Sequence, residues 1–226
     1  MNAIVHREGV EAGRLDMFVD GAFAFTLTLL VIGGDVIPDS TAKLLHALGG
    51  IPAFAACFFQ IAFFWHGHVH WRERCPESDA RSRWLSLLLV FFALIFIYPL
   101  HMVYASVFNG ISPIFPSEFR PADTSDMRIL FTCFGLCYAC MAGTLTLLFR
   151  HAAKRAEREG FDARFAQLGQ WKWSVPAAIG LASALVALLM PDSAPGILWM
   201  LPGLMYALLF LIGPVTTRFR RRHGLV

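Results

Sequence analysis

The sequence is short of charge. Only 15% of its 226 residues are Asp, Glu, Lys or Arg, whereas soluble domains usually carry about 25%. Hydrophobic residues make up 57% of the chain, and the mean hydropathy is +0.57. A chain of this composition lacks the polar residues that would cover a water-soluble globule. The composition therefore predicts an integral membrane protein.

Cysteines are few, and they lack the partners of a metal site. Cys137 and Cys140 form a C-x-x-C motif, but it lies in an apolar run with no histidine or second cysteine pair nearby. A free thiol in such a run behaves as a small hydrophobe, so packing is the expected role. The first sixteen residues hold five charges and no short apolar core before a cleavage site. We expect the first membrane helix to direct insertion.

Six apolar runs are long enough to cross a hydrocarbon core, which takes about 20 helical residues. They cover approximately residues 17–37, 44–66, 84–108, 128–149, 173–191 and 195–216. The sequence thus predicts an all-α membrane protein with six transmembrane helices in a single domain, residues 1–226. The basic stretch between the fourth and fifth runs is predicted to be a helical extension broken near Gly160. Its cations face anionic headgroups by default, and it is assigned no regulatory role.

The basic residues predict the orientation of these helices. Sixteen of the 19 Arg and Lys residues fall in the N-terminal segment, the second and fourth connections and the C-terminal tail. The opposite side of the membrane would hold only Lys43, Arg120 and Arg128. Because positive charge accumulates on the cytoplasmic side, both termini are predicted to be cytoplasmic. The cations are spread over several loops, so they do not form a nucleic-acid-binding patch.

Asp20 places a carboxylate inside the first apolar run. A carboxylate in lipid costs several kcal/mol, so a helix that carries one usually turns it towards protein or water. Asp20 is therefore a candidate functional residue. The alternative is that it lies near the membrane surface and anchors the end of the helix.

Two nitrogen donors are predicted to lie at the level of Asp20. The second helix runs back towards the cytoplasm and ends in FFWHGHVHW, so Trp65 and His68 can reach the carboxylate with their ring N–H groups. Arg14 lies six residues before Asp20, about 240° around the helix, and should seek a neighbouring helix or subunit instead. His66 and His70 share a helix face, but no further cysteines or carboxylates complete a four-ligand shell, so no metal site is predicted.

An apolar stripe runs along the first helix. Phe25, Leu29 and Ile32 follow one another at i, i+4 and i+7, with Thr28 beside them. Taken alone, such a stripe indicates a face that is turned to lipid or packed against another helix.

The first helix resembles the opening signature of the endosomal/lysosomal potassium channel family and its bacterial six-helix relatives, R-x(3)-F-S-D-G-x-F-A-x(3)-T-L-L-V. The matching residues are Arg14, Phe18, Asp20, Gly21, Phe23, Ala24, Thr28, Leu29, Leu30 and Val31. The sequence departs from the family at Val19, usually serine, and at Phe25, usually isoleucine. Trp65 and His68 reproduce the W-x-x-H that ends the family's second helix, and Pro99 lies near the family's proline-phenylalanine pair.

The resemblance implies a homotetrameric channel that conducts K⁺, with some Na⁺. Its pore would be lined by Phe25, Leu29 and Ile32, with Thr28 influencing the preference among cations. Arg14, Phe18, Asp20, Trp65 and His68 would brace the pore helix rather than touch the ion. The sequence contains no TVGYG loop, so selectivity would have to come from side chains and pore diameter. No cofactor is expected.

Two other classes remain as alternatives. A secondary transporter would use Asp20 to bind a proton or cation, although the sequence has no pair of Gly/Pro-broken helices in matching halves. A membrane enzyme would need a converging nucleophile, base and electrostatic groups, and the helices carry too few polar residues for that. The expected location is a bacterial inner membrane, which the chain crosses several times.

Overall fold

The computed structural model describes residues 2–32, 38–75, 79–211, 213 and 217; side chains are described from residue 13 on, except those of residues 31, 32 and 211. All the regular structure within these ranges is helical. The chain divides into two compact units, Met1–Ala122 and Asp123–Val226. Each unit is described separately below.

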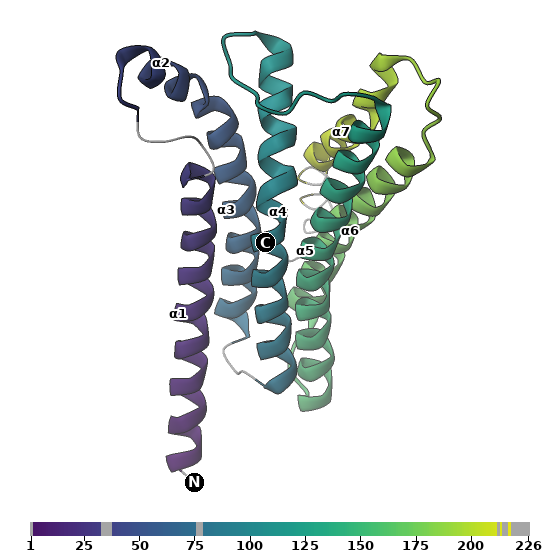
Figure 1. Ribbon diagram of the computed structural model, residues 1–226. Helices are drawn as coiled ribbons and strands as arrows, with labels where there is room; N and C mark the ends of the chain where they lie inside the picture. The colour runs from purple at the N-terminus through teal and green to yellow at the C-terminus, as the bar shows by residue number, and fades with distance from the viewer. Residues whose placement is uncertain (1, 33–37, 76–78, 212, 214–216, 218–226) are drawn as a thin grey trace. The chain divides into compact units, whose positions relative to one another are not determined.

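The first unit contains four helices: α1 (Asn2–Ile32), α2 (Thr41–Gly49), α3 (Ile51–Arg74) and α4 (Ala80–Ile111). Helices α1, α3 and α4 pack against one another, and α2 continues from the start of α3 at an angle of 42° (Figure 1). The span predicted over 44–66 is therefore a bent pair of helices.

Short local signals explain these boundaries. Gly50 separates α2 from α3, and Pro52 occupies the first turn of α3, where the missing N–H costs nothing. Asp79 caps α4: its carboxylate accepts from Ser82 N at 2.8 Å, and Ser82 Oγ accepts from Asp79 N at 3.0 Å. This reciprocal pair is a capping box.

The interior of the first unit is apolar and rich in rings. Phe64 of α3 and Phe96 of α4 meet edge to face with their centroids 6.3 Å apart, a favoured geometry for aromatic pairs. Val19 and Phe23 of α1 are also buried. This packing fixes which side of α1 faces the rest of the unit.

In the second unit, α5 (Thr124–Glu159) and α6 (Arg164–Leu189) form a hairpin, followed by the short elements η1 (Gly196–Met200), α7 (Leu201–Leu204) and η2 (Met205–Leu211). The Asp123 carboxylate caps α5 by accepting from Ser125 N at 2.8 Å. Gly160 ends α5 with a φ of 76°, a left-handed conformation that favours glycine. This is where the sequence predicts a break.

Small residues bring α5 and α6 into close contact. A Cβ placed on Gly135 would lie 2.7 Å from the carbonyl oxygen of Gly180 and 2.9 Å from the Cβ of Ala184. One placed on Gly169 would lie 2.2 Å from the Phe149 ring. In a membrane the hydrophobic effect does not drive helices together, so they associate through close backbone packing of this kind.

Three helices in the described part of the chain, α4, α5 and α6, are long and apolar enough to cross a membrane, and the bent pair α2 and α3 would make a fourth. Helix α1 begins well before residue 17, where its apolar run starts. Over the region predicted as one span, 195–216, η1, α7 and η2 follow one another without a gap, and the apolar helical run Gly196–Phe210 is shorter than the helices that can cross a membrane by length. Pro202 lies in the first turn of α7. Residues 212 and 214–216 of this predicted span lie outside the described residues.

Candidate functional site

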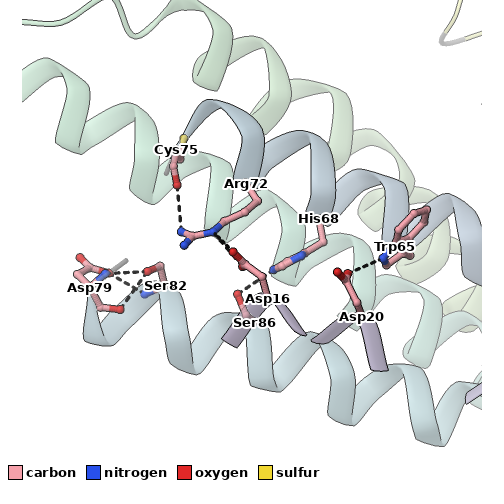
Figure 2. Close-up of polar contacts among 9 residues, drawn as sticks. All are labelled: Asp16, Asp20, Trp65, His68, Arg72, Cys75, Asp79, Ser82 and Ser86. Carbon is pink, nitrogen blue, oxygen red and sulfur yellow. Dashed lines mark hydrogen bonds and ion pairs between the residues drawn. The ribbon is translucent and has the colours of Figure 1, made fainter. Parts of the chain in front are cut away.

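The candidate site is the polar side of α1 where it meets α3. Trp65 of α3 donates its indole Nε1–H to Asp20 Oδ1 of α1 at 2.8 Å (Figure 2). The contact is exposed to solvent, and its geometry is that of a direct N–H···O bond. The two residues are 45 positions apart in the chain, so this bond fixes the register of α1 against α3.

A second carboxylate on α1 is held one helical turn away. Arg72 of α3 places Nε 2.9 Å from Asp16 Oδ1 and 3.0 Å from Asp16 Oδ2 (Figure 2). The same guanidinium donates through Nη1 to the backbone oxygen of Cys75 at 3.2 Å, at the end of α3. Both members of the ion pair are partly shielded from solvent, so the attraction between them is screened less than in an exposed pair.

This ion pair was not predicted from the sequence, although the spacing of its residues contains a signal for it. Asp16 precedes Asp20 by four residues, and Arg72 follows Trp65 by seven. Both separations return to the same face of a helix. In antiparallel helices, a contact between Asp20 and Trp65 therefore brings Asp16 and Arg72 to a common level.

His68 lies close to this network but bonds elsewhere. Its Nε2 is 3.0 Å from Ser86 Oγ of α4, and the imidazole is buried (Figure 2). His68 was predicted to reach Asp20, but in the structure its partner is Ser86 of α4. His68 thereby links α3 to α4.

The two faces of α1 differ sharply in burial. Val19, Phe23, Thr26 and Leu30 are buried within the first unit. Thr26 satisfies its hydroxyl by donating to the backbone oxygen of Ala22 at 2.8 Å. This face attaches α1 to α3 and α4.

The other face of α1 carries the residues predicted to line a pore. Phe25 is 57% exposed, Thr28 is exposed and Leu29 is half-buried. Phe18, predicted to brace the pore helix, is also 57% exposed within the chain. The side chain of Ile32 lies outside the described residues. The described part of the predicted stripe thus lies on a face of α1 that the rest of the first unit leaves largely uncovered.

Thr28 and Arg14 are the polar residues of interest on the exposed side of α1. Thr28 Oγ1 donates to the backbone oxygen of Phe25 at 2.7 Å, so its hydrogen is used within the helix and its oxygen lone pairs are available to a cation or water. Arg14 is exposed and, among the described residues, has neither a hydrogen bond nor an ion pair. It was predicted to seek a neighbouring helix or subunit.

The other ring residues near the end of α3 have structural contacts. His66 and His70 stack with their centroids 6.2 Å apart. Trp71 is buried and contacts His68 at a centroid distance of 5.3 Å. Trp84 does face outward, as an interfacial tryptophan would.

Comparison with known proteins confirms the family resemblance. Residues 14–97 match the sequence model of the family described as "Endosomal/lysosomal potassium channel TMEM175". The matched region contains α2, α3 and much of α1 and α4, with every residue of the polar network. A protein of Marivirga tractuosa named "Potassium channel" is 25% identical over 152 residues, which cover 65% of this chain and 61% of that protein.

Solved structures share the fold of the chain. The crystal structure of a variant of the potassium channel MtTMEM175, in complex with a nanobody–MBP fusion protein, aligns with a TM-score of 0.76 at 21% identity, covering 94% of this chain and 94% of that one. A lysosomal potassium-selective channel TMEM175 homolog from Chamaesiphon minutus aligns with a TM-score of 0.59 at 18% identity, covering 92% of this chain and 98% of that one. The all-helical fold is thus the fold of TMEM175 channel structures.

Proposed function

Starting from its resemblance to the endosomal/lysosomal TMEM175 potassium channel family, we propose that the chain is a potassium-preferring cation channel of the bacterial inner membrane. It conducts K⁺ passively, with some leakage of Na⁺, and catalyses no reaction. Six transmembrane helices place both termini in the cytoplasm. The distribution of basic residues along the sequence supports this orientation.

One structural observation carries the proposal: α1 is anchored along one face and uncovered along the other. Trp65 and Arg72 hold the carboxylates of α1, while Phe25 and Thr28 face away from the first unit. A pore lined by one helix per chain requires several chains around an axis, and homo-oligomers usually close with cyclic symmetry. We therefore propose a homotetramer in which four copies of α1 surround the pore.

Conduction and selectivity follow from the chemistry of that exposed face. Rings of Phe25, Leu29 and Ile32 form a hydrophobic constriction, which can gate by excluding water when it is narrow. The Thr28 hydroxyls supply oxygen atoms to a partly dehydrated cation. Because the sequence contains no TVGYG loop, no continuous carbonyl ladder replaces the hydration shell, so the preference for K⁺ over Na⁺ should be moderate.

Ion flux through liposomes that contain only the purified protein tests this function. Vesicles are loaded with K⁺ and diluted into medium containing Na⁺ or an impermeant cation, with a proton ionophore providing the return current. Flux without an imposed pH gradient, larger for K⁺ than for Na⁺, is the expected result. Protein-free vesicles serve as the control.

The same assay distinguishes a channel from a secondary transporter that uses Asp20. Flux that saturates with cation concentration and requires a pH gradient would overturn the channel. An absence of flux under both conditions, from protein that elutes as a homogeneous oligomer, would also contradict it.

A further inference from the structure

The end of α5 carries a row of cations beyond its last apolar residues. Arg150, Lys154 and Arg158 follow one another at i, i+4 and i+8, so they lie within about 80° of each other around the helix. All three are exposed. We refer to these three residues as the basic stripe. Because α5 ends at Glu159 and α6 begins at Arg164, the stripe leads up to the turn that joins these helices.

The carboxylates nearest the basic stripe bond to other residues in the described part of the chain. Glu157 accepts a hydrogen bond from Gln167 Nε2 of α6 at 2.8 Å, and Glu159 pairs with Arg155 at 2.8 Å. Within the part of the chain that the structure describes, the basic stripe makes no hydrogen bond or ion pair. Like charges at i and i+4 repel by a few tenths of a kcal/mol per pair. An external anion would relieve this repulsion.

The contacts of the hairpin place the stripe at the edge of the apolar part of α5. Phe149 packs against Gly169 of α6, and Trp171, 46% exposed, lies two residues from Gly169 towards the apolar part of the hairpin. Exposed tryptophan is typical of the boundary between hydrocarbon and headgroups. Arg150 immediately follows Phe149, and the eight residues to Arg158 rise about 12 Å.

That rise covers the headgroup layer, which is roughly 5–8 Å thick on each side of a bilayer. The long side chains of Arg and Lys can extend or fold back to reach phosphates at this level. Guanidinium groups also match phosphate oxygens with two parallel hydrogen bonds. Both the position and the chemistry of the stripe therefore fit lipid phosphate.

We propose that the basic stripe binds the phosphate groups of anionic phospholipids in the leaflet that surrounds this end of the hairpin. The exposed Trp171 and the adjoining apolar helix favour a lipid headgroup over a soluble acidic protein. The proposal requires α5 and α6 to lie in a membrane, but it does not require conduction. A binding assay without ions in transit can therefore test it separately from the channel function.

Native mass spectrometry of the full-length protein in detergent, titrated with phosphatidylglycerol or phosphatidylcholine, measures this binding. Wild type should retain phosphatidylglycerol in preference to phosphatidylcholine. In the variant R150Q/K154Q/R158Q, the affinity for phosphatidylglycerol should fall roughly 100-fold, because three cations that attract anionic headgroups are removed. Raising the salt from 0.1 M to 0.5 M should weaken wild-type binding, because salt screens the attraction.

The matched control is R220Q/R221Q/R222Q, which removes the same three charges from the C-terminal tail, outside the described residues. It should retain most of the wild-type affinity. Equal losses in the two variants would show a net-charge effect and overturn the assignment to the stripe, as would an unchanged affinity in R150Q/K154Q/R158Q. A wild type without preference for phosphatidylglycerol would overturn it too. Thermal unfolding of each variant establishes that the fold is intact.

Discussion

A single methyl group added at Gly135 should loosen the α5–α6 hairpin. The added Cβ would lie 2.7 Å from Gly180 O, 2.8 Å from Ala184 N and 2.9 Å from Ala184 Cβ. None of these atoms can rotate away, because two belong to the backbone and the third is itself a Cβ. The helices would have to separate by roughly 0.5–1 Å to restore carbon–carbon distances of about 3.5–4.0 Å.

The size of the effect follows from a comparison with Gly143, which lies on the same helix. A Cβ at Gly143 would meet nothing within 4 Å. Replacing either glycine by alanine gains helix propensity, up to about 1 kcal/mol, and this gain cancels between the two variants. The difference that remains is the cost of overpacking, typically about 1–3 kcal/mol. It corresponds to a difference in melting temperature of roughly 2–12 °C for a chain of this size.

Tryptophan fluorescence during thermal unfolding in detergent measures this difference. Gly135→Ala should melt below Gly143→Ala, and combining Gly135→Ala with Gly180→Ala should be non-additive because the two sites share one contact. Equal melting temperatures for Gly135→Ala and Gly143→Ala would refute the close approach of the two helices.

Three further predictions concern α1 and the cap of α5. Asp20→Ala removes the acceptor of the Trp65 indole. It should lower the yield of tetramer in size-exclusion chromatography more than it lowers the flux per tetramer. A normal yield with altered selectivity would contradict a bracing role. Leu29→Asn should wet the constriction and raise basal K⁺ flux in liposomes, and unchanged flux would place the constriction elsewhere. The pKa of Asp123 is lowered, most by the hydrogen bond from the Ser125 side chain and then by those from the backbone. The ionised carboxylate of Asp123 therefore contributes to stability above about pH 4, and this contribution is lost as the pH falls through the lowered pKa. The difference in melting temperature between wild type and Asp123→Ala should therefore shrink in acid, and a constant difference down to pH 2 would contradict this cap.

The contact between Asp20 and Trp65 could be predicted from the sequence because it depends on few facts. Positive charge set the direction of each helix, and direction placed the end of the second helix at the level of Asp20. The contact then required only one strong N–H donor within reach of the Asp20 carboxylate. The partner of His68 depended instead on the rotation of α4, which its almost uniformly apolar sequence does not specify.

Helix boundaries were harder to predict because lipid-compatible runs are apolar on every side. Hydropathy merged α2 and α3 into one span, although Gly50 and Pro52 signal the bend between them. There local backbone chemistry decided the structure, whereas hydropathy reports only the length that a membrane can accommodate.

The exposed face of α1 could be assigned to a pore only through the resemblance. The apolar stripe at Phe25 and Leu29 fits lipid, another helix or a pore equally well, because each can receive apolar side chains. Which of these three environments the stripe faces depends on neighbouring copies of the chain. Selectivity is likewise a property of the assembled ring rather than of one helix.

Thiol accessibility along α1 tests directly whether this helix lines the pore. K⁺ flux is recorded from liposomes containing Thr28→Cys or Val19→Cys, before and after adding a small cationic thiol reagent; wild type measures the effect on the five native cysteines. Thr28 is exposed and Val19 is buried within the first unit. A pore lined by α1 predicts rapid block of Thr28→Cys and no block of Val19→Cys beyond the wild-type level. Undiminished flux through Thr28→Cys, after labelling of the thiol is verified by mass, would contradict a pore lined by α1.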